Sequence, residues 1–482
     1  MILRPPGILI ALGYFTADQG WEVHRALYGF RQSPKLWSDY RDQELEEMRV
    51  EDFFLKQLES ESCLWVIKKP GDTEVHGALV TYVDDLLLLG EERLAARWVE
   101  EIKRKWEVSE PEKVEAGKPT RFLGMELSRS HTGQWYAKQE AYTKDLLLRN
   151  LGPDQEKWPR RRIPVAREEE EDPTTKEEPN RTPMEVREAQ RVVGELIWLV
   201  TRCRPDIMYA TSLMSTLTTR KPLKVMRMAY QVWCYLAGTL EEGLAFRGTT
   251  EDLMVYTDAS FGEEDAHGCV VVQWGEDPLV WRSSRQGMLT TSTAEAELVE
   301  VMEGAVTTEA LRVMVEELVD GPVRCWQFTD SSAALTIIVS DTASWRTRHL
   351  RKRARFLRWK ALRGDVLMRH QPGSEMVADV GTKPLSAVKL KEHKQRLGMD
   401  IKENEVKLKH NHKEKNEVKK TQHEGRLRLA LMMALIARGK AQFDEEDEDE
   451  GQNAFEWMMI IYTVLNGGHH HHHRPSSMGM DP

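Results

Sequence analysis

The segment 251–390 constrains the fold more than any other part of the chain, because strand-like and helix-like runs alternate in it with short connections. The runs LMVYTDASF, GCVVVQW and PLVWRSS predict three successive strands at 253–261, 268–274 and 278–284, the last two joined by a Gly-Glu-Asp turn. A long helix is expected over 292–320, where apolar residues recur at helical spacing.

The second half of this segment continues the alternation. We expect a strand at 323–330, helices at 331–339 and 347–364, a short strand at 365–372 and a last helix near 376–383. Strands and helices in this order predict an α/β (α+β) fold class, with a mixed sheet against which helices pack.

Four acidic residues stand where these elements end or border the predicted core. Asp258 follows the apolar run MVYT, Asp330 follows CWQFT, and Asp379 comes after a Pro-Gly turn. Glu297 lies beside the apolar stripe of the long helix. Taken singly, an aspartate at a strand end is more often a turn or a helix cap than a catalytic group. As an ordered set, the four predict a two-metal site for phosphodiester hydrolysis, because Mg²⁺ prefers oxygen ligands and several negative charges are needed to hold two divalent ions.

A second acidic feature lies in TYVDDLLLLG at 81–90, where Asp84 and Asp85 stand between two runs of strand-forming residues. Like charges this close repel each other, and burying them costs several kcal/mol without compensation. A bound cation would compensate, so the pattern predicts a metal-binding turn between two strands.

The region between 345 and 370 is strongly basic, and Asp365 is its only acid. A solvated helical face normally mixes charges of both signs, so this bias predicts contacts to phosphate groups. The residues expected to make these contacts are Arg348, Arg351, Lys352, Arg355 and Arg358.

Composition limits the classes of protein to which the chain can belong. Its 482 residues are enough for about three domains. The five cysteines form no CxxC pair, which argues against a zinc ribbon or a disulfide framework. No apolar run approaches the roughly 20 residues of a membrane span, and no signal peptide is expected. We therefore expect no membrane partner, and the sequence leaves the cellular compartment open.

Two hydrophilic stretches divide the chain. Prolines and blocks of like charge at 158–183 predict a linker or exposed loop, and 184–250 is expected to be mostly helical. From 391 onward polar and charged residues dominate, with an acidic run at 444–450 and a histidine run near the end. This composition predicts a mostly disordered charged tail over 391–482, and it leaves open an interaction protein that binds partners through the tail.

Several motifs, in the same order along the chain, resemble the Pol polyprotein of copia-type LTR retrotransposons. The segments TDAS, STAEAELVE, FTDSS and ADVGTKPL resemble its ribonuclease H domain, as do WRSSRQ and TRHLRKRARFLR. The segments ALYGFRQSPKLW, TYVDDLLLLG and FLGMEL resemble its reverse transcriptase. The segments VVGELIWLVTRCRPDIMYATSLMS and YLAGTLEEGLAF resemble its thumb-to-connection region. The resemblance covers roughly residues 1–390.

The resemblance implies roles for the residues that match these motifs. In the ribonuclease H part, two Mg²⁺ ions would be held by Asp258, Glu297, Asp330 and Asp379. Glu297 is chosen over Glu295 because a large residue, Leu298, directly follows it. The family activity is hydrolysis of the RNA strand of RNA–DNA hybrids, leaving a 3′-hydroxyl and a 5′-phosphate. Such hybrids are recognised by shape, backbone and 2′-hydroxyl groups. The implied partners are therefore the hybrid and other parts of a retroelement polyprotein.

Three further assignments follow from the same resemblance. Asp84 and Asp85 would be two of the three metal-binding acids of the polymerase. Gln32, with Ser33 and Pro34, would lie near the nucleotide or template, and His370 would help to release product.

The sequence departs from the family in its first residues. The third polymerase aspartate should follow an earlier strand. Asp18 is the only acid ahead of Glu22, and it lies in a loop-like stretch instead of after an apolar strand. We therefore expect a truncated reverse transcriptase palm over 1–157 that does not polymerise, and a helical thumb or connection over 184–250. An RNase H-like domain is expected over 251–390. The alternative is a non-catalytic nucleic-acid-binding remnant of a retroelement polyprotein, and the sequence also leaves open a gene-model fragment.

Overall fold

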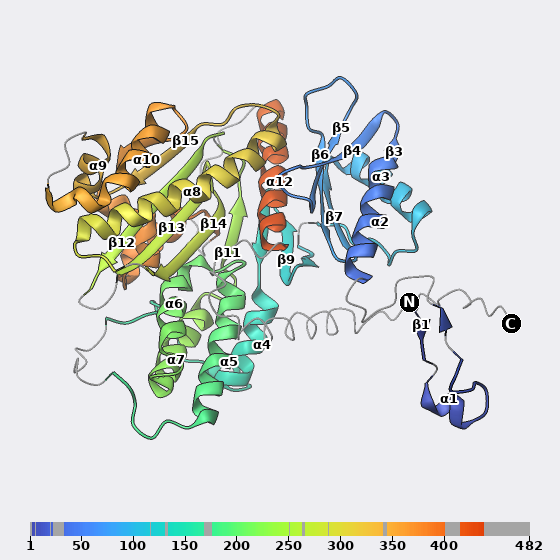
Figure 1. Cartoon of the computed structure of the whole chain (residues 1–482), viewed down its shortest axis with the longest axis horizontal. Coiled ribbons are helices and arrows are strands. Elements are labelled where there is room, and N and C mark those ends of the chain that lie inside the picture. Colours follow the sequence, from blue (N-terminus) through green and yellow to red (C-terminus); the bar gives the residue numbers. More distant parts are fainter. Residues whose placement is uncertain are drawn as a thin grey trace.

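The computed structural model describes most of the chain up to residue 400 and one further helix. The described residues are 2–4, 6–19, 21–22, 33–115, 117–130, 134–167, 176–249, 251–262, 266–287, 289–340, 345–400 and 415–437. They form three five-stranded sheets and a small two-stranded one (Figure 1). Gln32, for which we predicted a contact to nucleotide or template, lies outside the described residues.

The first of the larger sheets, the β12–β16 sheet, has the mixed topology expected for 251–390. Its spatial order is β14-β13-β12-β15-β16. The central strand β12 pairs antiparallel with β13 and parallel with β15. The strands are β12 (Leu253–Phe261), β13 (Ala266–Trp274), β14 (Asp277–Arg285), β15 (Cys325–Thr329) and β16 (Leu367–His370).

Helices pack against this sheet where the apolar spacing predicted them. The helices are α8 (Thr293–Val319), α9 (Ser332–Val339) and α10 (Arg351–Leu362), with a short 3-10 helix η3 (Trp345–Leu350) before α10. The last predicted helix, near 376–383, is wrong in type. It is the 3-10 helix η5 (Val377–Gly381), and an α-helix that we did not predict, α11 (Ala387–Arg396), follows it.

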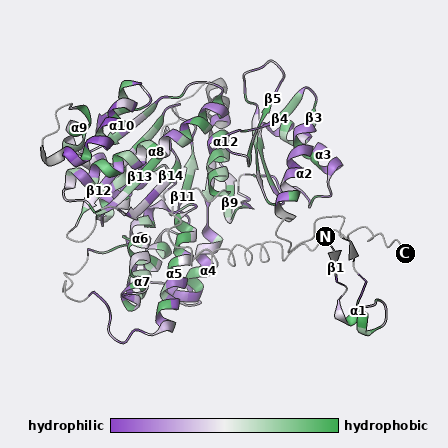
Figure 2. Cartoon of the chain, in the orientation of Figure 1, coloured by the Kyte–Doolittle hydropathy of each residue, from purple (hydrophilic) through white to green (hydrophobic). Residues whose placement is uncertain are grey.

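The β3–β7 sheet is an antiparallel meander that is buried on both faces. In β5, Trp65 and Ile67 belong to the core beneath α2 and α3, whereas Leu64 and Val66 belong to the core on the opposite face. This alternation follows from the two-residue period of a strand. Figure 2 shows these strands predominantly hydrophobic and the outer helices largely hydrophilic. The elements are β3 (Arg49–Val50), β4 (Phe53–Gln57), β5 (Leu64–Lys68), β6 (Gly77–Tyr82), β7 (Asp85–Gly90), α2 (Ser33–Glu47) and α3 (Glu92–Lys105).

The opposite face of the β3–β7 sheet is covered by a helix from the predicted tail. This helix, α12 (Lys415–Ala437), lies between the β3–β7 sheet and the β12–β16 sheet (Figure 1). All residues from Leu429 to Leu435 are buried, as is usual for a helical segment that is apolar on all sides. Disorder from 391 onward is therefore wrong for the end of α11, for strand β17 (Met399–Asp400) and for α12, which packs against β6 and β14 from distant parts of the chain.

The third sheet joins segments that we assigned to separate regions. Its order is β17-β11-β10-β9-β8, so that β17, from beyond residue 390, pairs with β11, from before residue 250. The strands are β8 (Thr120–Phe122), β9 (Met125–Arg129), β10 (Trp135–Lys138) and β11 (Gly243–Phe246). The surrounding helices are α4 (Glu140–Leu151), α5 (Pro183–Val200), α6 (Met208–Leu217) and α7 (Pro222–Gly238), with short 3-10 helices η1 (Gln155–Lys157) and η2 (Pro205–Ile207).

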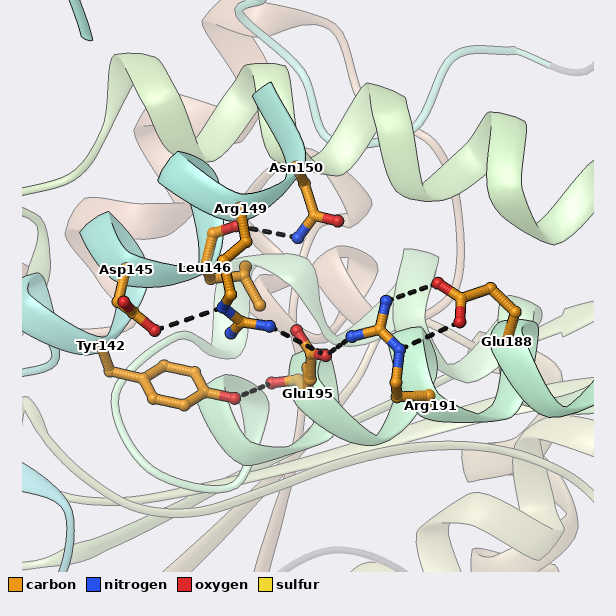
Figure 3. Close-up of polar contacts among 8 residues, drawn as sticks. All are labelled: Tyr142, Asp145, Leu146, Arg149, Asn150, Glu188, Arg191 and Glu195. Atoms are coloured by element: carbon orange, nitrogen blue, oxygen red, sulfur yellow. Dashed lines mark hydrogen bonds and ion pairs between the residues drawn. The ribbon is translucent and has the colours of Figure 1, made fainter. Parts of the chain in front are cut away.

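A buried carboxylate ties α4 to α5 (Figure 3). Glu195 is 3% exposed and forms ion pairs with Arg191 of its own helix and Arg149 of α4. The Tyr142 hydroxyl donates to the main-chain carbonyl of Glu195 at 3.0 Å. Burial of a charge is tolerated when it is paired and hydrogen-bonded, so this cluster is a structural contact between the two helices.

The predicted linker at 158–183 is partly packed. The Trp158 side chain is buried, and its indole N–H donates to Gly152 O at 2.8 Å. The main-chain N–H of Arg161 donates to Cys234 O of α7 at 3.1 Å. Residues 168–175 lie outside the described residues, and the part just before them lies on α7 instead of spanning two domains.

The first residues stand apart from these sheets. The strands β1 (Ile2–Leu3) and β2 (Trp21–Glu22) pair with each other, and the helix α1 (Gly7–Ala11) lies beyond them (Figure 1). Across the described ranges, every helix is too short or too polar to traverse a bilayer.

Candidate active site

Three of the four predicted nuclease acids meet at one end of the β12–β16 sheet. Asp258 is on β12, Asp330 directly follows β15, and Asp379 is in η5. One carboxylate oxygen from each of the three lies within 4.8 Å of the other two. Asp258 and Asp379 are buried, and Asp330 is partly exposed. Because β12 and β15 run parallel, the acids at their ends are brought to the same edge of the sheet.

Glu297, the fourth predicted acid, reaches this cluster from α8. Its Oε1 accepts a hydrogen bond from Ala259 N, the residue after Asp258, at 3.2 Å. Its Oε2 is buried and receives no hydrogen bond from any described residue. A buried carboxylate oxygen without a donor, next to three other carboxylates, suits a cation.

The close approach of α8 to β12 depends on Gly304, which is two helical turns after Glu297 and on the same face. A Cβ at this position would lie 2.6 Å from Thr257 Cγ2 and 2.8 Å from Gln327 Nε2. The absence of a side chain therefore lets the helix lie close enough for Glu297 to reach the end of β12.

The loop that carries Asp379 is anchored to the sheet below it. The Ser283 hydroxyl of β14 donates to Gly381 O at 2.6 Å, and His267 Nε2 lies 2.8 Å from the same hydroxyl. A Cβ on Gly381 would lie 2.3 Å from Cys269 Sγ, so only glycine permits this packing. Ser283 belongs to the motif WRSSRQ, to which sequence reasoning assigned no role.

Two residues after η5 complete the cluster, and sequence reasoning missed both. The Thr382 hydroxyl donates to Asp258 Oδ2. Lys383 Nζ lies 2.9 Å from Asp379 Oδ1 and 3.4 Å from Asp258 Oδ2. The signal that could have found them is the quoted motif ADVGTKPL, in which a lysine follows the acid by four residues.

The electrostatics of the cluster are those of crowded carboxylates. Burial, together with the charges of Asp258 and Asp330, raises the pKa of Glu297 to about 9. Burial and Asp258 raise the pKa of Asp379 to about 7, and they also raise the pKa of Asp330. Like charges in a desolvated site favour protonation, so the acids cannot all be ionised at neutral pH without added positive charge.

The structure separates Glu297 from the neighbouring acids of α8. Glu295 accepts hydrogen bonds from Thr291 and faces His349, while Glu300 accepts one from Gln286 at 3.0 Å. Both are 5% exposed. Burial raises the pKa of Glu300 to about 7. These two acids have structural partners of their own, which Glu297 Oε2 lacks.

His370 lies beside the cluster at the end of β16. Its Nε2 is 3.2 Å from Asp330 O, and its side chain is exposed. It is therefore adjacent to the acids without contacting their carboxylate oxygens within the described structure.

The metal-binding turn predicted for TYVDD joins β6 and β7. Asp84 and Asp85 are exposed at this turn. Partial burial of the carboxylate by the surrounding protein, together with the charge of Asp84, nevertheless raises the pKa of Asp85. The turn is held by α2, where Arg41 Nη1 and Trp37 Nε1 donate to Val83 O at 2.7 and 3.1 Å. Within the described residues these two acids are not grouped with a third possible metal ligand.

The basic helix is confirmed as an element, but its residues divide into two kinds. The side chains of Arg348, Arg351, Lys352 and Arg355 are exposed. Arg358 instead donates to Ile338 O at 2.7 Å and to Ser340 O, and so ties α10 to the end of α9. Its contact to phosphate stays a prediction, and the structure adds a structural role that the sequence did not indicate.

Curated relatives were found for most of the chain. It is 25% identical over 388 residues to the retrovirus-related Pol polyprotein from transposon RE1 of Arabidopsis thaliana, a match that covers 78% of the chain and 25% of that protein. The match to the RE2 polyprotein of the same plant is 25% identical over 406 residues and covers 82% and 26%. The chain is a homologue of copia-type retrotransposon Pol polyproteins. The resemblance read from the motifs is thereby confirmed.

A third relative is matched over nearly its whole length. The putative transposon Ty5-1 protein of Saccharomyces cerevisiae is 25% identical over 316 residues, which is 63% of this chain and 93% of that protein. The chain spans about a quarter of the length of the two plant polyproteins. No family model matches the chain.

Similar solved structures match about a quarter of the chain. An RNase H1 isolated from compost is 18% identical with a TM-score of 0.23, and the match covers 27% of this chain and 91% of that one. RNase H1 from the archaeon Halobacterium salinarum is 17% identical with a TM-score of 0.21, covering 26% and 90%.

Proposed function

We propose that the chain is a retroelement ribonuclease H that hydrolyses the RNA strand of RNA–DNA hybrids with Mg²⁺. The observation that carries this proposal is the convergence of Asp258, Glu297, Asp330 and Asp379 from separate elements on one end of the β12–β16 sheet. Binding of nucleic acid alone does not require buried carboxylates, which repel the phosphate backbone.

The four carboxylates fit divalent cations by the chemistry of their donors. Mg²⁺ takes hard oxygen ligands, and the raised pKa values of Glu297 and Asp379 indicate a site with a deficit of positive charge. When bound, divalent ions there would lower the pKa of water and stabilise charge on the phosphate. The role of the acids themselves would be to hold and orient these ions. Glu297 is fixed for this role by the hydrogen bond from Ala259 N, and Asp258 by the hydrogen bond from the Thr382 hydroxyl.

The substrate would be positioned by charge beside the acids. The exposed side chains of Arg348, Arg351, Lys352 and Arg355 form a basic surface on η3 and α10, which offers contacts to the phosphates of a hybrid. His370, at the edge of the cluster, is proposed to assist product release.

The experiment that tests the proposal is cleavage of a labelled RNA–DNA hybrid by the full chain in Mg²⁺, with Asp330→Asn beside it. Asp320→Asn is a matched control, because Asp320 ends α8 in the left-handed conformation that Asn tolerates. We expect cleavage by the parent and the control and none by Asp330→Asn. Hybrid binding without cleavage by the folded parent would favour the non-catalytic remnant instead.

We also propose that residues 1–157 do not polymerise in this chain. The support is that, among the described residues, Asp84 and Asp85 are not grouped with a third possible metal ligand, and the early acid Asp18 lies in the first segment, outside the β3–β7 sheet. Templated primer extension by the purified chain would refute this proposal.

A further inference from the structure

Lys383 occupies the position between two of the proposed metal ligands. Its ammonium nitrogen lies 2.9 Å from Asp379 Oδ1 and 3.4 Å from Asp258 Oδ2. The side chains of Asp258 and Asp379 are 2% and 9% exposed, whereas the Lys383 side chain is 42% exposed. One positive charge thus sits against two buried carboxylates while remaining in contact with solvent.

The backbone of Lys383 is fixed, and its side chain is not similarly confined. Lys383 N donates to Asp379 O at 3.2 Å, which closes the turn that follows η5. A lysine side chain has a flexible four-carbon stem and a compact charge, so the ammonium can leave the carboxylates without any movement of the main chain. The exposed part of the side chain gives it a route into solvent.

The contacts of Lys383 are those that a cation in this cluster would need. An ammonium and a divalent cation both seek the same carboxylate oxygens, and they repel each other at short range. Occupation by one must therefore weaken occupation by the other.

We propose that Lys383 is a positioning residue that holds the acidic cluster together when metal is absent and competes with the divalent cation for Asp258 and Asp379. Lys383 thereby sets the metal concentration at which the site fills. This inference rests on the proposed nuclease function, since it takes the four acids as metal ligands.

The test is direct binding of Mg²⁺ to the full chain by calorimetry, without nucleic acid. Lys383→Met keeps an unbranched side chain, one atom shorter, and removes its charge, and Lys391→Met on the exposed side of α11 is the matched control. We expect Lys383→Met to bind Mg²⁺ more tightly by on the order of tenfold, since loss of a competing unit charge in contact with the ligands is worth at least that factor. We also expect its thermal midpoint to be lower than that of the parent in EDTA and to recover at saturating Mg²⁺.

A second variant keeps the test decisive should Lys383→Met not fold in EDTA. Lys383→Arg retains the charge and binds carboxylates in a bidentate manner, so its Mg²⁺ affinity should be equal to or weaker than that of the parent. Tighter binding by Lys383→Arg would contradict the competition.

The outcomes separate this inference from the proposed function. Unchanged or weaker Mg²⁺ affinity in Lys383→Met, with binding still abolished by Asp330→Asn, would overturn the role of Lys383 and leave the metal site standing. A purely structural ion pair would give this result, with equal loss of thermal stability in EDTA and in Mg²⁺. Absence of site-specific binding in both the parent and Lys383→Met would overturn the metal site and this inference with it.

Discussion

Removal of the Arg428 side chain should show whether α12 is part of the folded core. Arg428 is fully buried, and its Nη1 lies 3.0 Å from Asp277 Oδ2 and 2.9 Å from Trp274 O. Asp277 also accepts hydrogen bonds from Arg247 N and Gly248 N, each at 2.8 Å. Breaking a buried ion pair by removing one partner costs about 3–5 kcal/mol. Because two main-chain donors remain for Asp277, we expect Arg428→Met to cost about 3 kcal/mol.

The assay is thermal unfolding of the full chain followed by circular dichroism. A loss of about 3 kcal/mol corresponds to a fall in midpoint of roughly 6 to 12 °C for a cooperative unit of about 150–250 residues. The control is Arg121→Met, which removes an exposed arginine from β8. In the double variant with Asp277→Asn, the total loss should be smaller than the sum of the single losses. An unchanged midpoint in Arg428→Met would refute the reasoning, because a helix that packs between two sheets cannot lose a buried charge without cost.

Three further predictions concern the candidate site. Without metal, the free energy of unfolding should fall as the pH rises from about 4.5 to about 9. Folding raises the pKa of Glu297 from 4.5 to about 9, so in this pH range the folded state keeps a proton on Glu297 that the unfolded state releases. Glu297→Gln should remove this part of the slope in denaturant unfolding at several pH values, and an unchanged slope would contradict it. Gly304→Ala should cost about 1–3 kcal/mol and reduce hybrid cleavage, because its methyl would lie 2.6 Å from a side chain of the adjacent strand. Its control is Gly321→Ala, whose methyl meets no atom within 4 Å. Arg355→Ala should reduce the salt dependence of hybrid affinity by about one unit of slope. Arg358→Ala should instead lower the thermal midpoint, because Arg358 ties α10 to the end of α9. Equal effects of the two changes on stability would argue against separate roles for Arg355 in phosphate contact and Arg358 in structure.

Local patterns predicted the β12–β16 sheet well, for an identifiable reason. The strands β12 and β13 are each nine residues long and rich in apolar residues, and α8 carries its apolar residues at helical spacing, so these elements are specified by their own sequence. The same reasoning failed at 376–383, where a single 3-10 turn stands in place of the expected helix. There the packing of Gly381 on Cys269 and the bond from Ser283 decide the backbone, and neither is visible in local periodicity.

In the candidate site too, some residues could be identified from local sequence and others only from the folded structure. The acids could be selected from sequence because each stands at the end of an apolar strand or on the face of a helix, within motifs of a known family. Lys383 could not be assigned, because its role depends on its distance from Asp258, more than a hundred residues earlier in the chain. The exposure of Asp84 and Asp85 is also a property of the folded turn, and the sequence alone suggested the reverse.

The amino-acid sequence by itself determined the order of the elements in 251–390, the set of four acids and the kinship with retrotransposon polyproteins, because these depend on residue type and spacing along the chain. Only the tertiary structure decided what covers the β3–β7 sheet and what neutralises the acids. The apolar run of α12 has no partner within its own stretch of sequence, and it gains one from the Leu64 face of β5, more than 350 residues earlier. Burial and charge pairing act through space, so contacts between residues this far apart exist only once the chain has folded.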